Sequence, residues 1–215
     1  MDIQSIKKEL DKKITLFHGG DTEMTIDKIK FPGPRPECDF GRAFYLTPSP
    51  DIAEEWIRNS PTPVISQYEL KYSEDAAIVL RDMDWVKVIV GFRTELYKVS
   101  FTRNIVIGAI ANDRMFEALP LFMRQGIGGI SDKMLFDCIS LVKLGDQYAL
   151  INNADGLEFQ KSYILKGKML QDAHQRHGER RRGMTKAIEN IRRQRYENER
   201  FIEDYIREGG NGITF

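Results

Sequence analysis

The stretch VISQYELKY, residues 64–72, carries the clearest strand pattern of the chain. Polar and apolar side chains alternate along much of it, so that Tyr68 and Leu70 fall on one face and Glu69 and Lys71 on the other. Earlier in the chain, ITLFHGG at residues 14–20 is a short apolar run that stops at two glycines. Both stretches therefore predict β-strands.

Further strand and helix patterns surround these two stretches in an irregular order. Strands are expected at 43–49, 76–82, 105–111, 146–152 and 157–165, and helices at 51–59, 113–125 and 130–143. Residues 85–94 fit either type, and residues 3–13 fit a short amphipathic helix. Because strands and helices do not alternate regularly, the order predicts an α+β fold with a mixed β-sheet core.

The composition is that of a globular protein. Of the 215 residues, 41% are hydrophobic and 10% aromatic, which is enough for a core. The 32 Lys and Arg balance 32 Asp and Glu, so the molecule as a whole is not an electrostatic nucleic-acid binder. No apolar run approaches the roughly 18 residues of a membrane span, no signal-peptide pattern opens the chain, and Cys38 and Cys138 are too few for a disulfide framework. We therefore expect a cytoplasmic protein without a membrane partner.

The composition changes after Leu165. Residues 166–208 hold 12 Lys or Arg and 8 Asp or Glu, a balance of +4, against 20 and 24 in the first 165 residues. Helix formers dominate there and strand patterns disappear. We expect a first domain at residues 1–165 and a charged helical C-terminal extension at residues 166–215, with a flexible glycine-rich segment at 209–212.

The basic residues of this extension have two interpretations. They could contact the phosphates of a nucleic acid, the candidates being His174, Arg176, His177, Arg180, Arg181, Arg182, Arg192, Arg193 and Arg195. Alternatively they lie on a solvated helix in which glutamates pair with arginines one turn away, as Glu189 would with Arg193, and the eight acids favour this second interpretation. His174 and His177 have no third ligand nearby, so no metal site is expected.

Three short segments could carry chemistry, although each alone has a structural explanation. His18 ends a strand beside two glycines, where a ligand could approach the backbone closely. DFGRAFYLT at residues 39–47 opens with a glycine turn onto a strand in which Phe44 and Tyr45 point to opposite faces. GDQY at residues 145–148 places polar side chains where a strand begins.

Together and in this order, the three segments resemble the ADP-ribosyltransferase superfamily, in particular its poly(ADP-ribose) polymerase and diphtheria-toxin-like branch. That branch has a His-Gly strand, a Phe-Gly-x-Gly-x-Tyr strand and a late Asn-Glu-Tyr strand. Here the matching residues are His18-Gly19, Phe40-Gly41-Arg42-Ala43-Phe44-Tyr45 and Asp146-Gln147-Tyr148. The order and spacing, together with GAIANDRMF at 108–116, are also similar to a family of small bacterial proteins of unknown function assigned to this fold. The resemblance covers about residues 14–165 and implies a split mixed β-sheet core with flanking helices.

The resemblance implies that NAD+ is the ADP-ribose donor and that no metal takes part. His18 would hydrogen-bond the ribose next to the nicotinamide, and the Gly19 backbone would hold the carboxamide. Tyr45 would stack on the nicotinamide ring, with Trp56 against its other face. Gln147 would bind a ribose hydroxyl and complete the catalytic set of His18, Tyr45 and Gln147. Cleavage of the glycosidic bond develops oxocarbenium character on the ribose, so orientation and electrostatics supply much of the catalysis.

The sequence departs from the branch at three positions. Gln147 replaces the usual glutamate, and a neutral amide binds a ribose but cannot act as a general base. We therefore expect transfer of a single ADP-ribose rather than chain elongation, with the base supplied by the acceptor, by Asp146 or by Asp113. Ala43 replaces a usual glycine, and Ala53 stands where a serine often contacts the carboxamide.

The resemblance thus implies a mono-ADP-ribosyltransferase that modifies a macromolecule, either a nucleic acid such as RNA or a protein. Family analogy further implies a bacterial toxin of a toxin-antitoxin or anti-phage defence system, with an antitoxin protein as a possible partner. Two other functions stay open: a catalytically silent module that binds NAD or ADP-ribose, and an interaction protein that displays the C-terminal helices to a partner.

Overall fold

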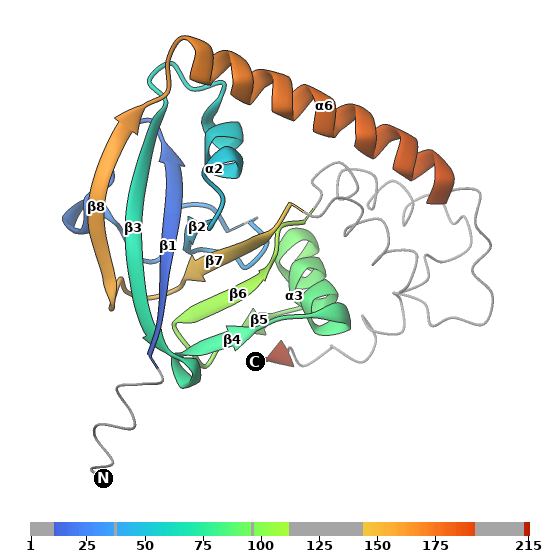
Figure 1. Cartoon of the computed structure of the whole chain (residues 1–215). Coiled ribbons are helices and arrows are strands. Elements are labelled where there is room, and N and C mark those ends of the chain that lie inside the picture. The colour runs from blue at the N-terminus through green and yellow to red at the C-terminus, as the bar shows by residue number, and fades with distance from the viewer. Residues whose placement is uncertain (1–10, 37, 96, 112–143, 192–212) are drawn as a thin grey trace.

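The computed structural model describes residues 11–36, 38–95, 97–111, 144–191 and 213–215, which form a mixed α+β fold (Figure 1). The strands make a three-stranded sheet, a four-stranded sheet and a two-stranded pair. The α+β prediction is confirmed. In chain order the elements are β1 (Asp11–Gly20), η1 (Ile26–Lys28), β2 (Phe44–Leu46), α2 (Pro50–Ile57), β3 (Val64–Ser73), η2 (Glu74–Ala76), β4 (Ala77–Val79), α3 (Asp82–Thr94), β5 (Val99–Ser100), β6 (Ile105–Ala109), β7 (Asp146–Leu150), β8 (Leu157–Ile164), α6 (Lys168–Ile191) and β9 (Ile213–Thr214).

The three-stranded sheet has the order β1-β3-β8 and is antiparallel throughout. The alternation predicted in β3 is observed, because Tyr68 and Leu70 are fully buried while Lys71 is exposed. β1 begins at Asp11, so residues 11–13 are strand and the expected helix at 3–13 is wrong there. Long-range pairing with β3 accounts for the difference, since Asp11 lies opposite Ser73.

The four-stranded sheet has the order β2-β7-β6-β4, in which β4 and β6 are parallel and the other pairs antiparallel. Residues 85–94, which fitted either a strand or a helix, lie in α3. The helices predicted at 113–125 and 130–143 lie outside the described residues, as does Asp113.

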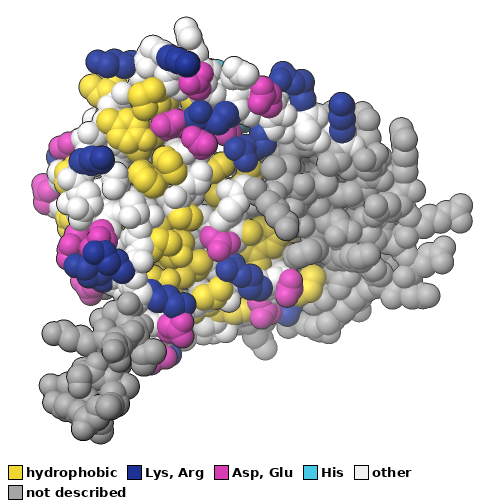
Figure 2. Space-filling model, in the orientation of Figure 1, with side chains coloured by type: hydrophobic (Ala, Val, Ile, Leu, Met, Phe, Trp, Pro, Cys, Tyr) yellow, Lys and Arg dark blue, Asp and Glu magenta, His cyan; other side chains and the backbone are white. Residues whose placement is uncertain are grey.

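Hydrophobic side chains pack on both faces of the four-stranded sheet. Between the two large sheets the core includes Leu16 and Tyr148, and between the four-stranded sheet and α3 it includes Trp85 and Ala149. Tyr148 and Ala149 are consecutive on β7 and so point to opposite cores. A smaller cluster around Ile65 joins α2 to the three-stranded sheet. On the surface, Figure 2 shows Lys and Arg interspersed with Asp and Glu, in keeping with the balanced net charge.

The C-terminal extension returns to the first 165 residues at two places. α6 runs alongside α2 (Figure 1), and β9 pairs in parallel with β5, with Val99 opposite Ile213. The expectation that strands disappear after Leu165 is therefore wrong at β9. A two-residue strand carries no periodic pattern, and its hydrogen bonds to distant residues define it, including Phe215 N–H to the Ser100 carbonyl at 3.0 Å. The glycine-rich segment at 209–212 lies outside the described residues.

Candidate functional site

The three sequence motifs lie on three neighbouring strands. β1, which carries His18, is joined to the chain just after β2 by reciprocal backbone hydrogen bonds between Phe17 and Thr47, of 2.8 and 3.0 Å. β2, which carries Tyr45, pairs with β7, which carries Gln147. We call the place where β1 meets β2 the junction, because the three-stranded sheet passes there into the four-stranded sheet.

Pairing between β1 and β2 stops beyond the Phe17–Thr47 bridge. Residues two apart on a strand direct their backbone groups to the same edge, so Gly19 faces β2 as Phe17 does, and Tyr45 faces β1 as Thr47 does. The Tyr45 carbonyl nevertheless accepts its hydrogen bond from His18 Nδ1, at 2.8 Å, and not from Gly19. Among the described residues, the N–H and C=O groups of Gly19 have no hydrogen-bond partner at this edge.

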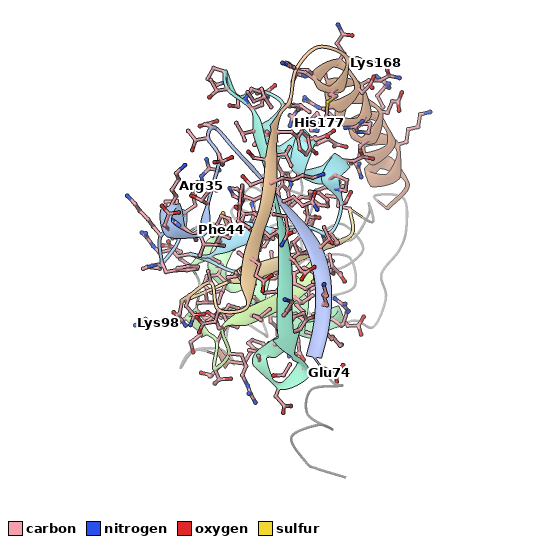
Figure 3. The ribbon with its side chains drawn as sticks, turned by 60° about the vertical axis from the view of Figure 1, so that its left-hand side comes forward. Arg35, Phe44, Glu74, Lys98, Lys168 and His177 are labelled. Atoms are coloured by element: carbon pink, nitrogen blue, oxygen red, sulfur yellow. The ribbon has the colours of Figure 1, made fainter. Side chains whose placement is uncertain are left out.

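The imidazole of His18 is fixed in one tautomer. A carbonyl oxygen only accepts, so Nδ1 carries the hydrogen and Nε2 of the neutral ring is an acceptor. Burial lowers the pKa of His18, and the hydrogen bond to the Tyr45 carbonyl opposes this shift only in part. The ring centroid lies 4.4 Å from that of Phe44, whose position is labelled in Figure 3. No described residue hydrogen-bonds to Nε2, which leaves an acceptor at the junction.

Gly19 is required by the close approach of α2. A Cβ atom added at Gly19 would lie 2.5 Å from the Ala53 carbonyl oxygen and 2.8 Å from a carbon of Ile57. At the next position, Gly20, the nearest atom would be 3.4 Å away. The structure therefore places Ala53 beside Gly19, the pair that the resemblance associates with the carboxamide, and gives Gly19 a packing role as well.

Hydrogen bonds of the hydroxyl and packing of the ring fix the side chain of Tyr45. Its hydroxyl accepts a hydrogen bond from Phe40 N–H at 2.9 Å and donates one to the Gly41 carbonyl at 2.8 Å, and its ring stacks on Phe40. Gly41 has a positive φ of 71°, and a Cβ there would lie 2.4 Å from the ring of Phe92. Burial raises the pKa of Tyr45 well above its ordinary value, so the phenol stays protonated. The Phe-Gly motif thus builds a tight loop that anchors Tyr45.

Gln147 is buried and its amide nitrogen is fully engaged. Nε2 donates to Asp39 Oδ2 at 2.5 Å and to the Ala109 carbonyl at 3.2 Å. Asp39, itself only 4% exposed, also accepts from Arg93 Nε at 3.0 Å, from Arg93 Nη2, and from Ala111 N–H at 3.0 Å. Asp39 opens the DFGRAFYLT segment, but no local pattern in the sequence marks its contacts with Arg93 and Gln147, which are distant along the chain.

Asp146, one of the candidate bases, is already paired. Its two carboxylate oxygens accept from Arg81 Nη1 at 3.3 Å and from Nη2 at 3.1 Å. It also precedes Gln147 on β7, so the two side chains point to opposite faces of the sheet. The carboxylate of Asp146 is therefore held by Arg81 and points away from the side chain of Gln147.

Trp56 lies on α2 with 38% of its surface exposed. Among the described residues, no ring contact joins it to Tyr45. The structure thus brings His18, Gly19, Tyr45 and Gln147 onto adjacent strands, whereas Trp56 lies on the solvent-exposed side of α2.

Comparison with known proteins gives one family. The profile of the DUF3990 family, described as a protein of unknown function, matches residues 14–159. The chain belongs to the DUF3990 family. The matched segment includes every predicted site residue and ends before α6. A search of the curated proteins gives no match, and a search of the solved structures gives none.

Outside the segment matched to DUF3990, α6 contributes arginines to a second buried network. Arg176 Nη2 donates to Glu54 Oε2 at 2.5 Å, and Arg180 binds both oxygens of Glu55, at 2.7 and 3.2 Å. Both glutamates lie on α2 and are less than a tenth exposed. Neither interpretation of the basic extension anticipated these partners, because α2 alone predicts an outward position for Glu54 and Glu55.

His177 belongs to the same network. Its Nε2 lies 2.9 Å from Arg58 Nη2, and its Nδ1 lies 3.8 Å from Glu55 (Figure 3 labels His177 on α6). The described residues of this DUF3990 member contain no group of three metal-ligating side chains, and none of their helices is long and apolar enough to cross a bilayer.

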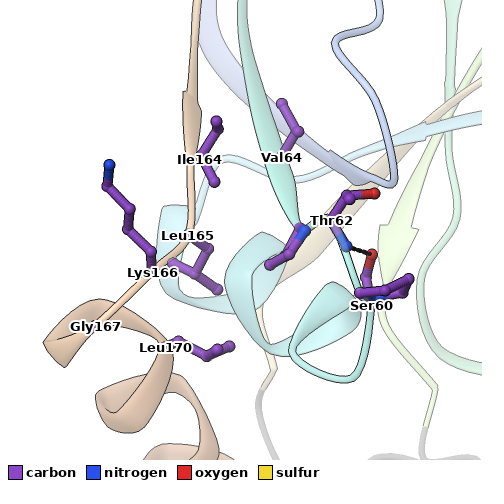
Figure 4. A pocket seen from close by; sticks show the side chains of 10 residues that line it. Ser60, Thr62, Val64, Ile164, Leu165, Lys166, Gly167 and Leu170 are labelled. Atoms are coloured by element: carbon purple, nitrogen blue, oxygen red, sulfur yellow. Dashed lines mark hydrogen bonds between the residues drawn. The ribbon is translucent and has the colours of Figure 1, made fainter.

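A cavity of about 360 Å³ lies away from the junction, between the start of β3 and the start of α6 (Figure 4). It is lined mainly by apolar residues such as Val64, Ile164 and Leu170. The hydroxyls of Ser60 and Thr62 at its rim both donate to Asp21. The cavity therefore offers little polar chemistry to a ligand.

Proposed function

We propose that the chain is a mono-ADP-ribosyltransferase that takes ADP-ribose from NAD+ and binds the nicotinamide end at the junction. The observation that carries the proposal is the set of polar groups without described partners on three adjacent strands: His18 Nε2, the Gly19 backbone and the Gln147 carbonyl oxygen. A carboxamide has one donor and one acceptor side, which complement the Gly19 C=O and N–H. Ribose hydroxyls can donate to His18 Nε2 and to Gln147 Oε1.

The transfer breaks the bond between the nicotinamide nitrogen and the ribose carbon. Nicotinamide leaves with the electron pair of that bond, a nucleophilic atom of the acceptor forms the new bond to the ribose carbon, and the acceptor releases a proton. Neutral His18 and the Gln147 amide hold the ribose while positive charge develops on it, so the site acts through orientation. Because the Gln147 amide is neutral, another group takes the proton, and the candidates are the acceptor itself, Asp113 and Asp146, whose carboxylate is bound by Arg81.

The same proposal extends to the setting. The acceptor would be a nucleic acid such as RNA, or a protein, and the enzyme would be a cytoplasmic bacterial toxin in toxin-antitoxin or anti-phage defence, held in check by an antitoxin. Arg176 and Arg180 are bound to α2, so they contribute less to a phosphate-binding surface than the sequence of the extension suggests.

Label transfer from adenine-labelled NAD+ to a bacterial lysate tests the activity. Label that survives protease but not nuclease identifies a nucleic-acid acceptor, and the reverse identifies a protein.

We expect His18→Asn to lower the rate of transfer by at least about tenfold, because its amide can still donate to the Tyr45 carbonyl but lacks the atom equivalent to Nε2. His18→Gln, which places a polar atom near the Nε2 position, should retain more activity.

Unfolding curves of both His18 variants provide the control for folding. Equal activity of folded His18→Asn and wild type would remove His18 from the site. Binding of NAD+ by the folded wild type without any transfer would instead favour the silent binding module, for which the loss of a glutamate at position 147 is the supporting observation.

A further inference from the structure

The buried carboxylate of Asp39 connects residues that are far apart in the sequence. Four hydrogen bonds converge on it, two from Arg93 on α3, one from the backbone of Ala111 after β6 and one from Gln147 on β7. Its side chain is 5% exposed, and that of Arg93 is 21% exposed. The Arg93 guanidinium lies against Asp39 and offsets part of the cost of burying its carboxylate.

The position of Asp39 determines which end of the Gln147 amide faces inward. Both groups that Gln147 contacts, the Asp39 carboxylate and the Ala109 carbonyl, can only accept hydrogen bonds. The amide nitrogen must therefore face them, and both of its hydrogens are used. The carbonyl oxygen Oε1 is left as the free end, with no hydrogen-bond partner among the described residues.

The same geometry explains why an amide occupies position 147. A glutamate there would bring a second carboxylate to about the 2.5 Å that now separates Gln147 Nε2 from Asp39 Oδ2. Two carboxylates so close cannot both be ionised. In this chain the carboxylate is that of Asp39, and Gln147, which donates to it, presents a neutral acceptor.

We propose that Asp39 is a positioning residue that holds the Gln147 amide so that Oε1 accepts a hydrogen bond from a ribose hydroxyl of the bound dinucleotide. This inference rests on the proposed function for the identity of the ligand. Asp39 and Gln147 together supply one carboxylate and one amide. Exchanging these two groups between the two positions keeps both the charge and the number of donors and acceptors.

The exchange provides the test. The variants are Asp39→Asn, Gln147→Glu and the double variant with both changes, and Glu158→Gln serves as a matched control because it turns an exposed, ion-paired carboxylate into an amide away from the junction. For each, kcat and KM for NAD+ are measured in the transfer assay, and the free energy of unfolding is measured by urea.

We expect each single change to lower kcat/KM by at least about tenfold, Asp39→Asn because the amide at 147 loses its fixed orientation and Gln147→Glu because two carboxylates face each other. The double variant should recover at least about tenfold over Gln147→Glu, since the amide introduced at position 39 can donate to the carboxylate introduced at position 147. The Glu158→Gln control should equal wild type. A double variant no more active than the product of the two single losses, in folded protein, would overturn the inference.

A second measurement separates this inference from the proposed function. If the wild type transfers no label, the proposed function fails, and the pair is then judged by NMR on the 15N-labelled side-chain amide of Gln147. A fixed amide exchanges its hydrogens slowly, and Asp39→Asn should accelerate the exchange whereas Glu158→Gln should not. Unchanged exchange in Asp39→Asn would show that Asp39 does not hold the amide.

Discussion

Two buried networks of acids and arginines stabilise this molecule, and they differ in whether they leave a polar group available to a ligand. In the first, Asp39 accepts from Arg93, from Ala111 and from Gln147, all within the segment that matches the family. In the second, Glu54 and Glu55 of α2 bind arginines of α6, which lies outside that segment. The first network fixes a polar side chain beside the junction, and the second fastens one helix onto another.

A buried ion pair therefore does not by itself indicate a binding or catalytic role. Asp39 has four donors and leaves an oriented acceptor, Gln147 Oε1, beside the proposed ligand. Within the part of the chain that the structure describes, the α2–α6 network leaves no such group, although Arg176 Nε is buried there without a hydrogen-bond partner. Because this arginine nitrogen can only donate and is buried, its missing hydrogen bond lowers the stability of the docked helix and offers no acceptor to a ligand.

The largest expected effect comes from removing the centre of the first network. Asp39→Ala removes a buried carboxylate that accepts from Arg93, from Ala111 N–H and from the Gln147 amide, so the free energy of unfolding should fall by about 3 kcal/mol. Urea denaturation measures it. Asp155→Ala, an exposed aspartate in the β7–β8 turn, is the control and should change the value by less than about 0.5 kcal/mol. A loss equal to that of the control would mean that the first network does not support the fold.

A smaller and more local effect is expected in the second network. In a double-mutant cycle, Glu55→Ala and Arg180→Ala should show a coupling of about 1–2 kcal/mol, because the bidentate pair is buried on the glutamate side. Hydrogen exchange should rise mainly in α6 and not across the sheets. Arg182→Ala, exposed on the same helix, is the control. Additive single effects, or exchange that rises equally everywhere, would contradict a docking role.

The smallest effect is a pH dependence of stability that the junction and the second network should share. Burial lowers the pKa of His18, and burial followed by the nearby Arg58 lowers that of His177. Because the unfolded chain protonates these rings first, at about pH 6.5, stability is complete above that pH and falls as the pH drops towards the folded pKa values.

His18→Asn and His177→Gln should each remove part of this slope, measured as the free energy of unfolding between about pH 7.5 and 5. NMR titration should place both rings below the ordinary histidine value. A His18 that titrates above it would contradict the neutral acceptor on which the proposed function depends.

Much of the fold followed from local patterns. The alternation in residues 64–72 predicted β3, the apolar run before Gly19 predicted the end of β1, and the pattern at 51–59 predicted α2, which the Ser49 hydroxyl caps by accepting from Ile52 N–H. These signals are readable because side-chain period and helix capping depend on neighbours in the sequence. The extent of β1 and the existence of β9 were not predictable, since each is defined by pairing with a distant strand.

The candidate site divides in the same way. Local sequence sufficed to predict a dinucleotide site, from a histidine before two glycines, a tyrosine after a glycine turn and an amide where a glutamate is usual. The three-dimensional packing was needed to show that Gln147 turns its nitrogen to Asp39, and that Arg176 binds Glu54. The physical reason is that these contacts join residues 108 and 122 positions apart, where packing alone brings donor and acceptor within reach.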